Sequence, residues 1–137
     1  MRSLLVLVLF TATAGAQANP GYKLDVPEHV DLEVGGGTLP LSITVDRGQT
    51  ISKDGGVTLD IAPDAGLAVR RRRLARTDAI DPDEVSPRFA IPLRADAAGD
   101  FAVKLHLRFW LCGTKICKPI DVRRSVTISV HAAAPAR

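Results

Sequence analysis

The chain contains two cysteines, and they lie close together in the segment FWLCGTKICKP, residues 109–119. Four residues separate Cys112 from Cys117, and the only tryptophan, Trp110, stands two positions before Cys112. A cysteine pair at this spacing can close a local loop as a disulfide, or it can exchange that disulfide with the thiols of another protein. The choice between these uses depends on the elements that position the two sulfurs.

The segments on either side of the pair have the alternating pattern of a β-hairpin. Residues 101–111 are apolar at every odd position, and residues 120–130 are mostly apolar at the even ones. Setting Cys112 opposite Cys117 around a loop at 113–116 makes core positions meet across the ladder. These pairs are Phe109 with Ile120, Leu107 with Val122, Val103 with Val126 and Phe101 with Ile128. Both sulfurs then emerge on the outer face of the sheet.

The same register makes predictions for the outer face. It places Arg108 opposite Asp121 and Pro119 opposite Trp110. Proline has no N–H to donate, so the strand is predicted to be an edge at Pro119. Facing Cα atoms in an antiparallel pair lie about 4.5–5.5 Å apart, which is within the range of a disulfide.

The energy of such a bond argues against a purely structural use without excluding it. Closing a loop of about six residues stabilises a protein by about 2 kcal/mol, against nearly 5 kcal/mol for a loop of about 100 residues. Lys115, Lys118 and Arg108 lie near the pair in sequence or on the same face, and positive charge favours the reactive thiolate. Local physics therefore leaves both a structural and a reactive pair open.

The rest of the chain indicates an all-β fold, an immunoglobulin-like β-sandwich of about seven strands. A small barrel is the competing architecture. Glycine-, proline- and aspartate-rich breaks, including Gly35-Gly36-Gly37, separate the strands and are expected to be turns. The strands are predicted at residues 30–34, 39–45, 57–61, 67–72, 89–93, 101–111 and 120–130.

The N-terminus predicts export. Residues 1–18 contain Arg2, an apolar run and the small-residue sequence Ala16-Gln17-Ala18, which is typical of a signal peptide. One domain is expected at 19–131, followed by a disordered tail at 132–137. No other stretch approaches the roughly 20 apolar residues of a membrane span, and a net charge of +3 does not favour nucleic acid as a partner. A secreted protein, most naturally of a bacterial periplasm, is expected.

The C-terminal hairpin, GDFAVKLHLRFWLCGTKICKPIDVRRSVTISV at residues 99–130, resembles the periplasmic N-terminal domain of DsbD-type thiol:disulfide interchange proteins. The resemblance implies that Cys112 and Cys117 are a redox pair, one forming a mixed disulfide with a partner and the other resolving it. It also implies periplasmic thiol/disulfide proteins as partners, a separate membrane protein as electron donor, and no cofactor. The spacing of the cysteines is shorter than expected for the family, and Phe89 or Trp110 would replace its shielding loop.

Other constellations carry weaker signals. Four consecutive arginines, Arg70, Arg71, Arg72 and Arg73, can bind an acidic partner, but a solvated sheet edge is the preferred interpretation. The three histidines, His29, His106 and His131, do not have metal-type spacing, and no metal site is predicted. The alternative to thiol exchange is a non-catalytic β-sandwich that binds a protein partner and keeps a structural hairpin disulfide.

Overall fold

A computed structural model describes residues 20–132. The predicted signal peptide at 1–18 and most of the predicted tail lie outside these residues. Within the described part of the chain, no helix is long and apolar enough to cross a membrane.

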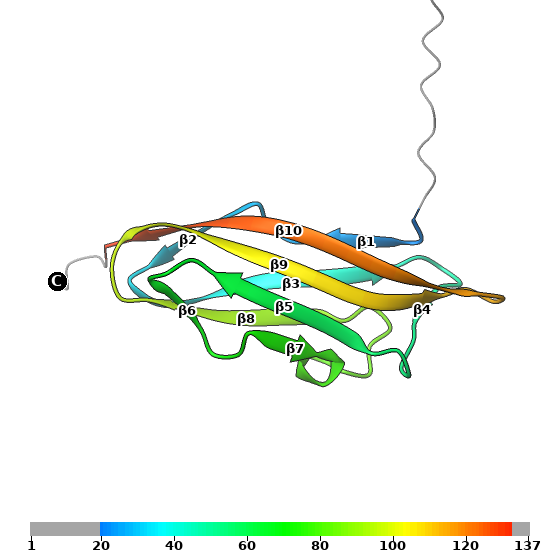
Figure 1. The fold of residues 1–137 in the computed structure, drawn as a ribbon. Helices are drawn as coiled ribbons and strands as arrows, with labels where there is room; N and C mark the ends of the chain where they lie inside the picture. Colours follow the sequence, from blue (N-terminus) through cyan, green and yellow to red (C-terminus); the bar gives the residue numbers. More distant parts are fainter. Residues whose placement is uncertain (1–19, 133–137) are drawn as a thin grey trace, which may run out of the picture.

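The described residues fold into two stacked β-sheets (Figure 1). The first sheet has the order β1 (Tyr22–Asp25), β3 (Gly35–Val45), β8 (Arg88–Ala95) and β6 (Leu67–Val69). The second has the order β2 (His29–Glu33), β10 (Cys117–His131), β9 (Gly99–Cys112), β5 (Val57–Pro63) and β7 (Arg73–Ala75), and the short β4 (Thr50–Ile51) also pairs with β9. A single turn of 3-10 helix, η1 (Arg76–Asp78), follows β7.

The core lies between the sheets and comes from the alternate positions of each strand. In β9 the odd positions from Val103 to Leu111 face inward and are almost fully buried, while β3 and β8 supply the opposite face. The buried residues of these three strands include Leu39, Leu41, Ile43, Phe89, Ile91, Val103, Leu105, Leu107, Phe109 and Leu111. The predicted immunoglobulin-like sandwich is therefore confirmed, with ten strands in the described residues.

The prediction of a single strand at 67–72 was wrong. Leu67–Val69 pairs with β8 in the first sheet, whereas Arg73–Ala75 pairs with β5 in the second. The chain crosses from one sheet to the other at Arg70, Arg71 and Arg72, at the edge of the sandwich. The side chains at this crossing are exposed to water, which explains why the segment can consist of arginines.

The prediction that Gly35-Gly36-Gly37 is a turn was also wrong. These glycines begin β3 and pair with residues 93–95 of β8. A Cβ on Gly37 would lie 2.2 Å from Cδ2 of Leu32, so a larger residue would collide with the neighbouring β2. Glycine therefore allows close packing between β3 of the first sheet and β2 of the second.

Candidate functional site: the cysteine pair at the hairpin tip

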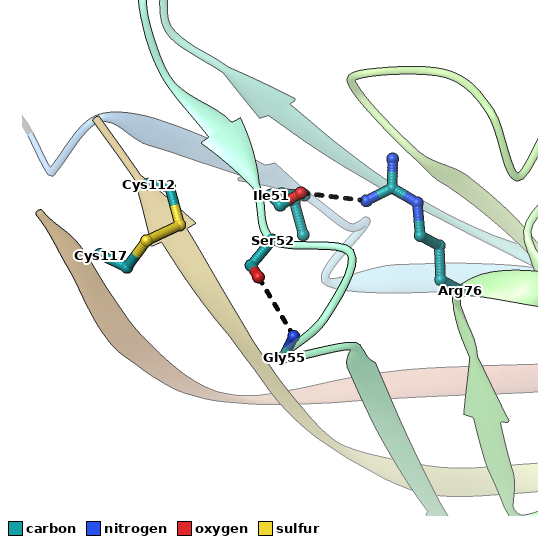
Figure 2. Close-up of a disulfide and its surroundings, with 6 residues drawn as sticks. All are labelled: Ile51, Ser52, Gly55, Arg76, Cys112 and Cys117. Atoms are coloured by element: carbon teal, nitrogen blue, oxygen red, sulfur yellow. Dashed lines mark hydrogen bonds between the residues drawn. A yellow bond between two sulfur atoms is a disulfide. The ribbon is translucent and has the colours of Figure 1, made fainter. Parts of the chain in front are cut away.

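The hairpin register predicted from sequence is confirmed along its whole length. Cys112 lies opposite Cys117, Phe109 opposite Ile120, and every position back to Gly99 and Val130 follows the same pairing. The two sulfurs form a disulfide, and the two Cα atoms are 4.0 Å apart. Figure 2 shows this bond joining the two neighbouring strands of the hairpin.

The disulfide occupies the closer of the two kinds of antiparallel pair. The backbone N–H of Gly113 donates to the carbonyl oxygen of Ile116 at 2.9 Å, so these two residues form a hydrogen-bonded pair. Pairs alternate along the ladder, which makes Cys112 and Cys117 a pair without mutual backbone hydrogen bonds, where Cα atoms approach most closely. The hairpin backbone thus brings the sulfurs together without help from the rest of the domain.

The two cysteines have different surroundings. On its far side, β9 is flanked by β4, with Thr50 opposite Cys112 and Ile51 opposite Leu111, and Cys112 is half-buried. Within the described residues, β9 is the only strand that pairs with β10 at Cys117, which is exposed. Cys117 is therefore the more accessible member of the pair.

The strand that flanks Cys112 is held in place from the arginine-rich segment. Nη1 of Arg76 donates to the carbonyl oxygen of Ile51 at 3.4 Å, and the N–H of Ser52 donates to the carbonyl oxygen of Trp110 at 2.9 Å. Figure 2 shows Arg76 reaching Ile51 beside the disulfide. The same guanidinium donates to the carbonyl oxygens of Pro82 and Glu84, so it joins three separate segments. Sequence reasoning did not assign Arg76 this role, because main-chain carbonyl partners leave no signal in the pattern of side chains.

Trp110 lies beside the pair on the outer face. It faces Pro119 across the ladder, is 42% exposed, and packs against Gly55 in the loop before β5. A depression of about 260 Å³ lies between these residues and Arg108. The prediction that β10 is an edge at Pro119 is confirmed, because β2 pairs with β10 only from Thr127 onward.

The ion-pair partners near the cysteines differ from those that the hairpin register alone would suggest. Arg108 and Asp121 are opposite one another in the backbone register, but Nη2 of Arg108 binds Oδ2 of Asp60 at 2.9 Å. Asp121 accepts a hydrogen bond from Nε2 of His106 at 2.8 Å. Lys115 and Lys118 are exposed and have no ion-pair partner among residues 20–132.

Two of the four arginines in the charged run form ion pairs within the domain. Arg71 binds Asp78, and Nε of Arg73 donates to Oδ1 of Asp60 at 2.7 Å. The hydrogen bond from Arg73, together with the nearby charge of Arg108, holds the pKa of Asp60 below its usual 3.8. Since β6 and β7 are the outermost strands of their sheets, the run lies at a sheet edge, as the preferred interpretation predicted.

Two of the three histidines, His29 and His131, form a cluster with Asp31 that the sequence did not predict. Nε2 of His29 and Nε2 of His131 lie 3.1 and 2.9 Å from Oδ1 of Asp31, and these contacts lower the pKa of Asp31, with His131 the larger cause. The parallel pairing of β2 with the end of β10 brings them together. Within the described residues, no group of three or more histidine, cysteine and acidic side chains is arranged to hold a metal ion.

Comparison with known proteins supports the fold and goes no further. No family model and no curated protein matches the sequence. A solved structure of α-2-macroglobulin from E. coli matches 83% of this chain at 18% identity and a TM-score of 0.51, over 7% of its own length. Other matches are WR4, a C. elegans MSP family member, at 10% identity and a TM-score of 0.44, covering 82% of this chain and 100% of that one. PapD-like domain 7 of human CEP192 matches at 9% identity and a TM-score of 0.44, covering 98% of this chain and 99% of that one.

Proposed function

We propose that this protein is an exported thiol–disulfide exchange domain that passes reducing equivalents through Cys112 and Cys117. The observation that carries the proposal is the position of the disulfide at the tip of a hairpin, with Cys117 exposed and Cys112 half-buried. The resemblance of residues 99–130 to the DsbD-type domain and the signal-peptide pattern of residues 1–18 support periplasmic thiol/disulfide proteins as its partners.

The unequal exposure of the cysteines favours Cys117 as the sulfur that a partner attacks. Exchange requires the attacking thiolate to approach along the S–S axis from outside, and access decides which sulfur reacts. Cys112 is flanked by Thr50 of β4, whereas β10 has an open side at Cys117. Lys118 next to Cys117 and Lys115 in the loop favour the thiolates that form on reduction.

Reduction of the domain then takes two exchange steps. A thiolate of the partner attacks Sγ of Cys117, the S–S bond breaks, and Cys112 leaves as a thiolate. The partner's second thiolate attacks the partner sulfur of the mixed disulfide and releases Cys117 as a thiolate. The partner is thereby oxidised to a disulfide, and the domain gains two electrons. In the reverse direction, Cys112 resolves the mixed disulfide on Cys117.

The reduction potential of the purified protein tests this proposal. Equilibration with a thiol–disulfide buffer, followed by quantification of free thiols, is expected to give a midpoint above roughly −300 mV. A midpoint below that value would describe a bond resistant to the thiol pool and would remove the basis for exchange.

Single-cysteine variants test the assignment of roles. Cys112→Ser leaves the exposed Cys117 and is expected to form a mixed disulfide with a small disulfide reagent faster than Cys117→Ser does. Equal rates for the two variants, or faster reaction of Cys112, would contradict the order of steps given above.

The second candidate is a non-catalytic sandwich that binds a protein partner through a hairpin tip stiffened by the bond. The exposure of two large apolar side chains on one hairpin, Ile116 at 73% and Trp110 at 42%, favours it, because exposed apolar surface suits a contact with a partner. In that case, replacing both cysteines by serine lowers stability and leaves partner binding largely intact. A mixed disulfide with a protein partner, trapped on a single-cysteine variant, would argue against it.

A further inference from the structure

Among residues 20–132, no strand covers part of one edge of the second sheet. β2 pairs with β10 only over Thr127–His131, so residues 117–126 of β10 have β9 on one side and no described strand on the other. The chain turns away at Pro27, because the preceding strand, β1, pairs with β3 in the other sheet. Strand β10 therefore has a ten-residue open edge, which begins at the exposed Cys117.

Hydrogen bonds at the covered end reveal which backbone groups point toward this edge. The N–H of Thr127 donates to Glu28, and the carbonyl of His131 accepts from Val34, both on the β2 side. The direction of the backbone N–H and C=O groups alternates from one residue of a strand to the next. The other odd-numbered residues of β10 therefore also direct these groups away from β9. Nη1 of Arg124 agrees with this direction, since it donates to the carbonyl oxygen of Arg123 at 3.0 Å.

The open edge therefore offers a ladder of unused main-chain groups. Asp121, Arg123 and Ser125 each direct an N–H outward, and Pro119 contributes only a carbonyl. Among residues 20–132, no strand pairs with this side of β10 at these three positions, and no side chain accepts from their N–H groups. An extended chain laid along the edge satisfies them in the way that a neighbouring strand does.

The side chains along the edge are strongly cationic. Lys118, Arg123 and Arg124 are exposed and have no carboxylate partner in the described residues, and Lys115 lies just beyond them in the loop. The single acidic residue of the edge, Asp121, is already bound by His106. A strand that pairs here is therefore favoured when its own side chains are acidic.

We propose that an extended acidic segment of a partner protein adds to the open edge of β10 as a further antiparallel or parallel strand. Its backbone carbonyls accept from Asp121, Arg123 and Ser125, and its carboxylates meet Arg123 on one face of the sheet or Arg124 on the other. Resting on the proposed function, the inference identifies the partner's docking segment as one that leads to Cys117, where exchange takes place. Proline and charge also protect sheet edges from pairing, and that alternative predicts no binding at all.

A cysteine-free probe tests the docking apart from the redox chemistry. An eight-residue peptide of alternating glutamate and valine is titrated into the isotopically labelled protein, and backbone amide shifts are recorded. The amides of Asp121, Arg123 and Ser125 are expected to shift together, and binding is expected to weaken roughly tenfold or more in high salt because the edge charges are exposed. No shift at these amides, or equal binding of a lysine–valine peptide, overturns the proposal.

Two matched controls separate strand addition from charge attraction alone. N-methylation of the peptide amides that face the edge is expected to abolish binding, whereas methylation of the alternate amides preserves it. Arg123→Glu with Arg124→Glu is expected to weaken binding roughly tenfold or more, while Arg70→Glu with Arg72→Glu makes the same charge change elsewhere and leaves it unchanged. Equal loss in both double variants, or self-association of the protein at this edge in place of peptide binding, overturns the proposal.

The result of the peptide-binding experiment does not depend on the reduction potential of the disulfide. The probe contains no thiol, so it is expected to bind the variant with Cys112→Ser and Cys117→Ser as well as it binds the disulfide form. A reduction potential below the exchange range with intact peptide binding would reject the redox role and keep the docking edge. A potential within the exchange range without peptide binding would keep the redox role and reject the docking edge.

Discussion

The ring of Trp110 lies directly on the backbone of Gly55. A Cβ built on Gly55 would lie 2.4 Å from Cδ1 of Trp110 and 2.9 Å from its Cγ. These atoms are at the attached side of the indole, so the whole ring has to move before position 55 can carry a side chain. Ser52 Oγ accepts from the N–H of Gly55 at 3.1 Å, as Figure 2 shows. This bond fixes the loop against which Trp110 packs.

Gly55→Ala is therefore expected to displace Trp110. We expect the free energy of unfolding to fall by about 1–2 kcal/mol, the usual cost of inserting a methyl group into a packed contact. Trp110 is the only tryptophan, so its fluorescence reports the displacement directly as a red shift. In the background of Trp110→Ala the same change should cost little, and a cost of equal size there would show that the contact is not its cause.

Gly37→Ala tests the close packing of β2 on β3. The new methyl group would meet Cδ1 and Cδ2 of Leu32 and force this half-buried side chain out of its position. We expect a loss of about 1–3 kcal/mol, measured by chemical denaturation. Gly36→Ala is the matched control, because its nearest neighbour would be a carbonyl oxygen at 3.4 Å. A smaller loss for Gly37→Ala than for Gly36→Ala would contradict the packing described.

Removal of the disulfide is expected to weaken the domain without unfolding it. The bond joins residues five apart in sequence, so Cys112→Ser with Cys117→Ser should lower the free energy of unfolding by about 2 kcal/mol. Reduction of the wild-type protein should cause a similar loss. Complete unfolding of the double variant in the absence of denaturant would mean that the hairpin depends on the bond for its structure.

The carboxylate of Asp60 is expected to make stability dependent on acid pH. Its pKa is lowered in the folded state by Arg73 and Arg108, so it stabilises the fold above its unfolded value of about 3.8. This contribution disappears as the pH falls through the lower, folded pKa. Asp60→Asn should therefore be less stable than the wild type at neutral pH and equal to it in strong acid. Asp96→Asn, at a 93% exposed side chain, is the control and should show little difference at either pH.

The hairpin was predictable because it is local. The period-2 pattern of β9 and the turn at 113–116 determine which residues face each other, so the pairing of Cys112 with Cys117 follows from the sequence. Lys115 and Lys118 could be placed beside the pair for the same reason. The alternation of apolar and polar residues does not predict which strand pairs with the other edge of β9 or β10.

Contacts between distant segments required the tertiary structure. The different exposure of Cys112 and Cys117 depends on β4, a two-residue strand too short to have a pattern of its own. The hydrogen bonds from Arg73 to Asp60 and from Arg76 to Ile51 depend on how the chain crosses between the sheets.

Local patterns were enough to predict the all-β class, the hairpin register and the facing cysteines, because a two-residue period and a short turn are local properties of the chain. The partial cover of β10 by β2, which begins at Thr127 and leaves Cys117 at an edge without a described neighbour, follows from long-range packing. That outcome depends on a parallel pairing between strands about 100 residues apart in sequence, and no local pattern specifies such a pairing.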